Sequence, residues 1–375
     1  MYKRQSYWVW DLLNAYIKKT EDGKGTIQQR WGLSKLNSTV LNDSSTKIRF
    51  LFEARWDNGT KDIIARAYDG WYKYNSSTSA FDDLDTGRTT DAKGFACMFM
   101  NNLIMVDGGV PRKCDSSYTV SNLSSDSSMP QDATACWVHQ HRLWLNSSSN
   151  PMKVYGSKVN DATSSTAWST SSDSVTLDLS QVLPEGDEVI GFRTMGDVIL
   201  VILCRKYIVI YNAPTTYDDI SLVQVIKIGA LSNYALAQLG NDWVFPSDSG
   251  VNSLTSSMTY QKLDIDDLTK FIAPLYRSFI SSVSDKQVIC GVYFHKLNHY
   301  YITLPAGSEF QTLVYSLDFK NFVGRFVFNG INPYSWVETE DGTLYIGGDT
   351  GYVYKYDENA NDDDGNTIKL SLIHI

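Results

Sequence analysis

The chain has 375 residues and a formal net charge of −9 at pH 7. Single hydrophobic cores stop growing at about 250–300 residues, so the chain holds either several domains or one radially repeated fold. The acidic balance argues against a protein that wraps duplex nucleic acid, because that affinity comes from cations at the phosphates. No stretch of about 18 apolar residues and no secretory signal pattern is present, so neither a membrane span nor export is indicated.

The composition favours a β-protein. Aromatic residues make up 13% of the chain, with 23 Tyr and 10 Trp, while Ser, Thr, Asn and Gly fill the stretches between short hydrophobic runs. Aromatic side chains fit pleated, half-buried surfaces, and the small polar residues fit tight turns. The expected class is therefore all-β.

The first five and the last six residues of the chain are interpreted separately from the fold. Residues 1–5 and 370–375 resemble peptides made when sequencing-adapter DNA at the edge of a metagenomic contig is translated, and we interpret both as scars. This leaves open whether a blade or a closing strand is lost at an end of the chain. Residues 6–47 form an N-terminal segment, in which the pattern of residues 6–19 does not decide between a strand and a short helix.

A hairpin pattern appears near both ends of the remaining chain. Residues 69–74 and 350–356 each run through a glycine into alternating aromatic residues that end in Tyr-Lys-Tyr. Glycine suits a tight turn, and the period of two that follows is that of a half-buried strand. One hairpin design is used twice.

Weaker versions of this turn recur between the two hairpins, at 107–109, 150–151, 205–206, 249–250 and 306–307. The turns fall 38 to 57 residues apart, and a period near 40 to 50 built from short strands is typical of a β-propeller. Residues 48–357 are therefore predicted to form a propeller of about six to seven blades. The alternative is an ordinary β-rich chain with irregularly spaced turns.

Two sets of residues are predicted to be architectural. The first set should occupy blade turns at positive φ, where a Cβ costs about 1 to 2 kcal/mol, and comprises Gly70, Gly108, Gly250 and Gly351. The second set should be buried in or against blade strands and comprises Trp71, Trp144, Trp243 and Tyr354.

A short helical insertion is expected near residues 267–281. Apolar residues recur there at spacings of three and four, and aspartates stand at the start. Pro274 lies inside the segment and is expected to kink or split the helix. The helix should pack on the outside of a blade or join two blades.

Histidines offer the strongest candidates for chemistry. On a strand, His139 and His141 would point the same way and could present two metal-ligand nitrogens. No third ligand stands nearby, so a packed or capping role is favoured. His295 and His299 flank a polar hairpin tip and are expected to be solvated.

The remaining polar candidates are interpreted as structural. The carboxylates of Asp82, Asp83 and Asp85 precede a glycine at a blade edge, with nothing to pair them across a cleft. Residues 358–369 contain an acidic run that does not fit a calcium loop, since its twelfth position is Ser371, and they are expected to form a polar, solvated tail.

No site is predicted for a catalyst, cofactor or metal. The sequence has no His-Glu-x-x-His, Gly-x-Ser-x-Gly, P-loop or Gly-x-Gly-x-x-Gly motif. The five cysteines are scattered, without a Cys-x-x-Cys, and are interpreted as core thiols of a reducing compartment: Cys97, Cys114, Cys136, Cys204 and Cys290. The protein is accordingly expected not to be an enzyme.

Several short motifs, in order along the chain, resemble one family. They are 29–32 (Gln-Arg-Trp-Gly), 138–144, 150–157, 160–161, 228–232, 239–245 and 249–251. Together they are similar to the tail-nozzle and packaged-DNA stabilisation proteins of short-tailed bacteriophages, and the likeness runs from about Arg30 to Asp357. Residues 30–32 depart from that pattern, in which a proline commonly precedes the glycine.

This resemblance implies a structural component of the virion tail, assembled in the cytoplasm of a bacterial host. It implies a homo-oligomeric ring below the portal and adaptor proteins that retains the packaged genome. Double-stranded DNA would pass through the ring without sequence-specific binding, which an acidic wall permits.

Two other classes stay open. A carbohydrate-binding or glycoside-active propeller would show convergent polar residues around the central channel. A cellular interaction scaffold would be a stable monomer that exposes loops to several partners.

Overall fold

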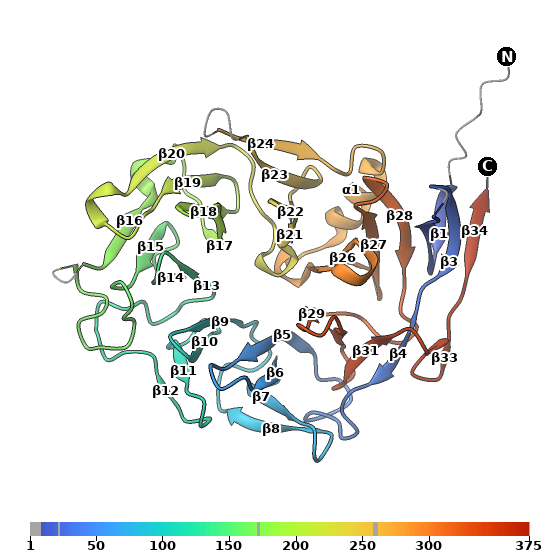
Figure 1. Cartoon of the computed structure of the whole chain (residues 1–375), viewed down its shortest axis with the longest axis horizontal. Helices are drawn as coiled ribbons and strands as arrows, with labels where there is room; N and C mark the ends of the chain where they lie inside the picture. Colours follow the sequence, from blue (N-terminus) through green and yellow to red (C-terminus); the bar gives the residue numbers. More distant parts are fainter. Residues whose placement is uncertain (1–8, 22, 171–172, 258–261, 375) are drawn as a thin grey trace.

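Seven sheets arranged around one axis make up a β-propeller (Figure 1). This computed structural model describes residues 9–21, 23–170, 173–257 and 262–374. Five of the sheets have four antiparallel strands in sequence order, and two are extended by strands from the chain ends. Short strands joined by tight turns suit such blades, because each blade buries both of its faces against its neighbours.

We number the blades 1 to 7 in chain order. Blade 1 has β5 (Ile48–Arg55), β6 (Lys61–Ala67), β7 (Gly70–Asn75) and β8 (Ala80–Asp85), and blade 2 has β9 (Phe95–Phe99), β10 (Asn102–Val106), β11 (Arg112–Cys114) and β12 (Val120–Asn122). Blade 3 has β13 (Cys136–His139), β14 (Arg142–Asn146), β15 (Lys153–Gly156) and β16 (Val175–Asp178), and blade 4 has β17 (Val189–Met195), β18 (Ile199–Cys204), β19 (Ile208–Asn212) and β20 (Ser221–Ile226).

The remaining blades follow the same order. Blade 5 has β21 (Ala237–Leu239), β22 (Asp242–Pro246), β23 (Val251–Ser257) and β24 (Lys262–Asp267), and blade 6 has β25 (Cys290–Phe294), β26 (His299–Ala306), β27 (Glu309–Ser316) and β28 (Asn321–Phe326). Blade 7 has β29 (Ser335–Glu338), β30 (Leu344–Gly347) and β31 (Val353–Asp357), and it is completed by β4 (Gly32–Lys35).

The N-terminal segment closes the ring. Strand β4 pairs antiparallel with β31, so one blade is built from both ends of the propeller. The innermost strands β29 and β5 then come into contact across the closure. The propeller therefore extends into the 6–47 segment, which the sequence alone placed before it.

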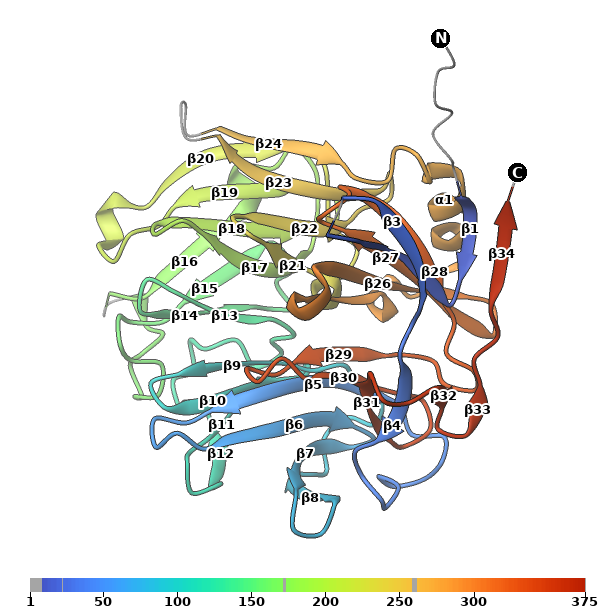
Figure 2. The same ribbon diagram turned by 45° about the vertical axis from the view of Figure 1, so that its right-hand side comes forward.

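The two chain ends also meet outside the ring. Strands β1 (Val9–Leu13) and β2 (Ala15–Lys19) both pair with β28, and β2 continues into a hairpin with β3 (Gly25–Gln29). Strand β34 (Ser371–His374) pairs with β1, and Figure 2 shows this added sheet along the flank of blade 6. Residues 9–13 and 15–19 are thus strands. The assignment of 370–375 to adapter-derived sequence stays a prediction.

The predicted acidic tail is part of blade 7. It contains β32 (Asp362–Asp363), which pairs with β4 and with β33 (Asn366–Thr367). Asp363 has no exposed side-chain surface, so the expectation of a solvated segment is wrong there. Its partner, Arg30, lies far away in the sequence and could not be assigned from the acidic run itself.

The one α-helix of the described residues is α1 (Ala273–Ser282). Pro274 stands at its first turn, where no backbone N–H is needed, so it starts the helix rather than kinking it. Asp267 is the last residue of β24 and residues 268–272 form a turn, so the helix begins later than predicted. It packs against β26, and no helix among the described residues is long and apolar enough to cross a membrane.

Short 3₁₀ turns occupy several connections: η2 (Leu179–Gln181), η3 (Tyr217–Asp219), η4 (Asn233–Ala235), η5 (Lys286–Val288) and η6 (His295–Leu297). Turns η4 and η5 precede the innermost strands of blades 5 and 6. Side chains of η4, such as Tyr234, line the cavity on the axis.

Two of the four predicted glycines have positive φ, Gly108 at 84° and Gly351 at 74°. The prediction is wrong for Gly70 and Gly250, whose φ values are not positive. At these two positions, glycine is required because neighbouring atoms leave no room for a Cβ. A Cβ on Gly70 would lie 2.8 Å from the Asp85 carbonyl oxygen, and one on Gly250 would lie 2.1 Å from Thr269 Oγ1.

The four aromatic residues singled out in the sequence lie in β7, β14, β22 and β31, and all are buried. They join separate clusters between neighbouring blades rather than one central core. The five cysteines are also buried and free, as expected for core thiols. The hydrophobic packing therefore follows the blade interfaces around the ring.

Candidate functional site

The central axis holds a cavity of about 990 Å³. Innermost strands of the blades line it, largely with aromatic and aliphatic side chains that include Phe50, Phe95, Trp137 and Trp336. Arg193 is also there, fully buried by its surroundings. Its guanidinium lies 4.7 Å from the ring centroid of Trp137, and burial lowers its pKa.

Tyr234 lines this cavity from a loop between blades. It sits on η4, before blade 5, and its ring reaches Phe50 and Phe95 on blades 1 and 2, with centroids 6.1 Å and 6.2 Å away. The same ring lines both the aromatic cavity and a second cavity. The tyrosine therefore lies between the two cavities.

The second chamber, which we call the polar mouth, has a volume of about 460 Å³. Its lining includes six ionisable residues besides Tyr234: Arg49, Asp91, Lys93, Asp107, Glu188 and Asp285. Most of these charges have partners. Arg49 forms a bidentate pair with Asp91, and Glu188 lies 3.0 Å from Arg205.

Two residues that line the polar mouth each carry a donor without a partner among the described residues. Lys93 Nζ and Asn233 Nδ2 are both buried from solvent and form no hydrogen bond. Lys93 lies 4.4 Å from the Tyr234 ring centroid. Because burial removes water from its ammonium group, the pKa of Lys93 falls from 10.5 to about 7.

The orientation of the Asn233 amide is set by its neighbours. Arg193 Nη1 donates to Asn233 Oδ1 at 3.0 Å, so the oxygen must face the arginine. Nδ2 then faces elsewhere and lacks an acceptor. Gly191 makes room for this amide, since a Cβ there would lie 2.2 Å from Asn233 Oδ1.

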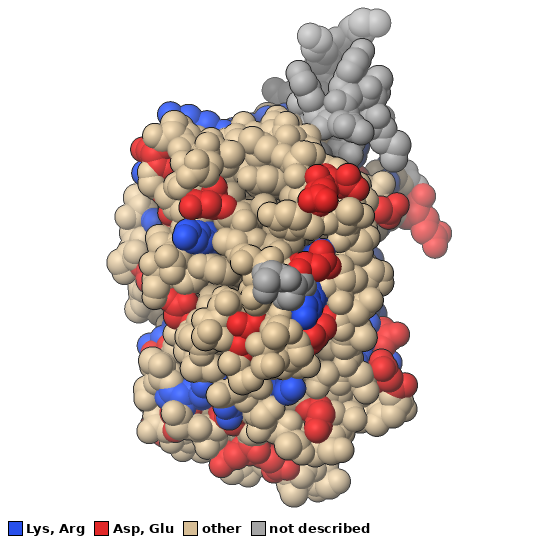
Figure 3. Space-filling model, turned by 90° about the vertical axis from the view of Figure 1, so that its left-hand side faces the viewer, with Lys and Arg blue, Asp and Glu red and all other residues tan. Residues whose placement is uncertain are grey.

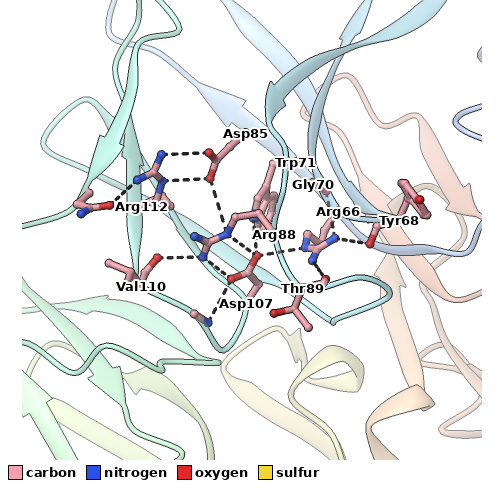
Figure 4. Close-up of polar contacts among 12 residues, drawn as sticks. Arg66, Tyr68, Gly70, Trp71, Asp85, Arg88, Thr89, Asp107, Val110 and Arg112 are labelled. Carbon is pink, nitrogen blue, oxygen red and sulfur yellow. Dashed lines mark hydrogen bonds and ion pairs between the residues drawn. The ribbon is translucent and has the colours of Figure 1, made fainter.

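One of the three carboxylates at the edge of blade 1, Asp85, belongs to an ion network between blades (Figure 4). Asp85 accepts two hydrogen bonds from Arg112, both 3.1 Å, across the interface to blade 2. Asp107 accepts from Arg88 at 2.6 Å and from Trp71 Nε1 at 3.3 Å. These contacts tie blade 1 to blade 2.

The network also explains the ionisation of Asp107. Burial opposes its negative charge, but the hydrogen bonds and charge of Arg88 outweigh burial and hold the pKa of Asp107 below its usual value. Asp82 and Asp83 are exposed on the same strand and do not join the network. The three carboxylates therefore form no paired catalytic site.

The His139 and His141 pair is not presented on a strand face. Gln140 and His141 have φ of 48° and 59°, which makes them the turn between β13 and β14. His139 is buried, with Nε2 at 2.9 Å from the Ala213 carbonyl oxygen, while His141 is exposed. A hairpin separates the imidazoles, so the metal alternative fails and the packed role holds for His139.

The other histidines divide in a similar way. The His295 side chain is exposed and pairs with Glu338 at 2.5 Å. His299 is buried, which contradicts the predicted solvated role, and its ring lies 4.9 Å from that of Tyr16. Burial lowers the pKa of His299 from 6.5 to about 4. The residue begins β26, so its side chain falls between strands instead of at the hairpin tip.

No group of three or more His, Cys, Asp or Glu side chains able to hold a metal occurs in the part of the chain that the structure describes. The groups that converge on the axis, Tyr234, Asn233 and Lys93, were not singled out from the sequence. Each lies in a loop between blades, where no periodic pattern marks it. The closest sequence feature that was noted is the motif at 228–232, which ends just before Asn233 and Tyr234 on η4.

Comparisons with known proteins establish the fold. No protein-family model and no curated protein matches the chain. Among solved structures, the extracellular domain of a hybrid two-component system from B. thetaiotaomicron superposes with a TM-score of 0.59 at 10% identity. That match covers 86% of this chain and 39% of the other, so this chain corresponds to less than half of that protein's length.

Two further structures match over nearly their whole length. Streptogramin B lyase has a TM-score of 0.55 at 11% identity, with 92% of this chain and 98% of that chain covered. The WD40 domain of Neurospora crassa Pan2 has a TM-score of 0.52 at 11% identity, with 88% and 97% covered. At such identities the shared feature is the propeller fold, because function resides in the sites that a fold carries.

Proposed function

We propose that this propeller is a structural subunit of a short-tailed bacteriophage tail, in the nozzle region that retains packaged DNA. The main support is the outer edge of β3. In the described residues β3 pairs with β2 alone, and its other edge carries no strand. An open edge of this kind accepts a strand from a neighbouring chain.

The β2–β3 hairpin is held firmly to the ring. Arg30 follows β3 directly, and it donates to both carboxylate oxygens of Asp363 in blade 7. The same guanidinium donates to Asn14 Oδ1 at 2.9 Å, before β2. A rigidly held edge suits a part that transmits force between subunits, because its position relative to the ring changes little.

The propeller axis bears on where DNA would travel. Aromatic side chains such as Tyr234 line that axis, and we place duplex DNA in the lumen of a ring of several copies. On the face drawn in Figure 3, acidic and basic side chains are interspersed and form no continuous basic band. Such a surface lets DNA slide with little retention, since affinity for phosphates requires clustered cations.

Assembly with neighbouring gene products tests this role. The chain would be mixed with the portal and adaptor proteins encoded beside it and examined by sedimentation and electron microscopy, with ring-shaped complexes as the expected result. Ile27, half exposed on β3, would be replaced in Ile27→Lys, which should abolish assembly because a buried lysine is unpaired.

A matched variant controls for surface charge. Leu222 is similarly exposed on the outer strand of blade 4, and Leu222→Lys should assemble normally. A chain that stays monomeric with the adaptor, or metabolic genes in place of tail genes around the reading frame, would refute the proposal. Catalytic turnover of glycans would favour the carbohydrate alternative instead.

A further inference from the structure

We propose that the polar mouth binds a small organic carboxylate, held between the Lys93 ammonium and the Asn233 amide. This inference does not depend on the tail role. It starts from two buried donors without acceptors, Lys93 Nζ and Asn233 Nδ2, on two residues that both line this chamber. Buried donors are nearly always hydrogen-bonded, so two unpartnered donors on residues of one chamber indicate that an acceptor is missing.

An ammonium without a hydrogen-bond acceptor favours an anion over a neutral group. The titratable groups around Lys93 come from four places in the chain: Arg49 on β5, Asp285 before η5, Cys290 on β25 and Tyr234 on η4. Asp285 attracts the ammonium but forms no hydrogen bond with it. Cys290 and Tyr234 are neutral at pH 7, since burial raises the pKa of the thiol to about 12 and that of the phenol further.

The remaining charges of the chamber favour a monoanion. Asp91 is neutralised by Arg49, Asp107 by Arg88, and Glu188 by Arg205. Lys93 is therefore the one lining cation without an ion-pair contact among the described residues, and the carboxylates around it would repel a phosphate dianion. One carboxylate supplies one charge and two acceptor oxygens, which matches one ammonium and one amide donor.

The dimensions and walls of the chamber also fit such a ligand. Its volume of about 460 Å³ lies in the range of small-molecule sites. Tyr234 forms an apolar wall on the axial side, next to the two donors. The site is built by three connections between blades, 86–94, 227–236 and 283–289, which is where propellers and other rigid scaffolds carry binding groups.

Matched sugars provide the test. D-glucuronate and D-glucose share a ring and differ in a carboxylate, and their binding would be measured calorimetrically at pH 6 and pH 8.5. Glucuronate should bind at pH 6 and glucose should not. Because Lys93 loses its proton near pH 7, glucuronate affinity should fall about tenfold or more at pH 8.5.

Three variants locate the site. Lys93→Met should abolish glucuronate binding, and Asn233→Asp should do the same while keeping the acceptor that Arg193 needs. Lys61→Met removes the same charge from an exposed ion pair and should bind normally. Thermal unfolding of each variant verifies that it is folded.

Each contrary result overturns the proposal. Equal binding of glucose and glucuronate would make the site a hydroxyl-binding one. Absence of saturable glucuronate binding to the folded protein at pH 6 would mean that the orphan donors hold only water. Equal loss of binding in Lys61→Met would place the interaction elsewhere on the surface. None of these results bears on assembly of the ring.

Discussion

Arg30 and Asp363 lie 333 positions apart and form a buried ion pair, with 2.5 Å between Nη2 and Oδ2 and no exposed side-chain surface on either residue. The pair joins the segment after β3 to β32. It fastens the two ends of the chain to the closed ring, and the Asn329 backbone N–H also donates to the same carboxylate at 2.8 Å.

Breaking this pair should destabilise the protein strongly. Arg30→Met leaves the Asp363 carboxylate buried without its counter-ion, which costs about 3–5 kcal/mol in comparable sites. We expect that loss in denaturant unfolding. Lys206→Met, which removes an exposed pair with Glu185, is the control and should shift the midpoint little. Equal losses in the two variants would show that burial of the Arg30 pair is immaterial.

The two kinds of glycine should respond differently to substitution. Gly108→Ala should cost about 1 kcal/mol because of its positive φ, and Gly108→Asn should cost less, since asparagine tolerates this conformation. At Gly70 the obstacle is the Asp85 backbone, so Asn should be no better than Ala. Unfolding free energies of the four variants distinguish the causes. Rescue by asparagine at Gly70 would contradict the steric explanation.

His299 should make stability depend on pH. Its pKa is about 4 when folded and 6.5 in an ordinary setting, so between these values the unfolded chain binds more protons. Stability should therefore fall as pH drops from 6.5 to 4, by about 2–3 kcal/mol at pH 4.5. The difference between wild type and His299→Phe in urea unfolding isolates this contribution. Identical pH profiles of the wild type and His299→Phe would contradict this prediction.

Removing the channel tyrosine should join the two chambers. Tyr234→Ala deletes the contacts to Phe50 and Phe95 and should cost about 3 kcal/mol or more. Water would then reach the Lys93 ammonium, so its pKa should rise toward 10.5. NMR titration of lysine side chains labelled with ¹³C at Cε measures that shift. Tyr217→Ala, at an exposed position, should change neither quantity.

The thiols should be unreactive in the folded protein. All five cysteines are buried, and burial raises the pKa of Cys114 to about 12. Thiolate is the nucleophile, so a disulfide reagent at pH 8 should label none of them before unfolding and five afterwards. Rapid labelling of any cysteine in the native state would show local opening of a blade interface.

The propeller class followed from local patterns. In hairpins such as 69–74 and 350–356, the alternation of aromatic residues and the turn glycine lie within a few consecutive residues. The spacing between turns can likewise be counted along the sequence. The burial of Trp71 and the free cysteines follows from apolar runs of the same kind. Such patterns depend on residues close together in the sequence, so they can be recognised without a structure.

The properties that depend on closure of the ring could not be predicted from the sequence. His299 and Asp363 look solvated in sequence, because the groups that bury them, Tyr16 and Arg30, come from the opposite end of the chain. Gly70 needs no side chain because of a backbone on the next strand. Tyr234 and Lys93 meet at the axis only because separate loops point inward when the blades close into a circle, and a contact of that kind has no local periodicity.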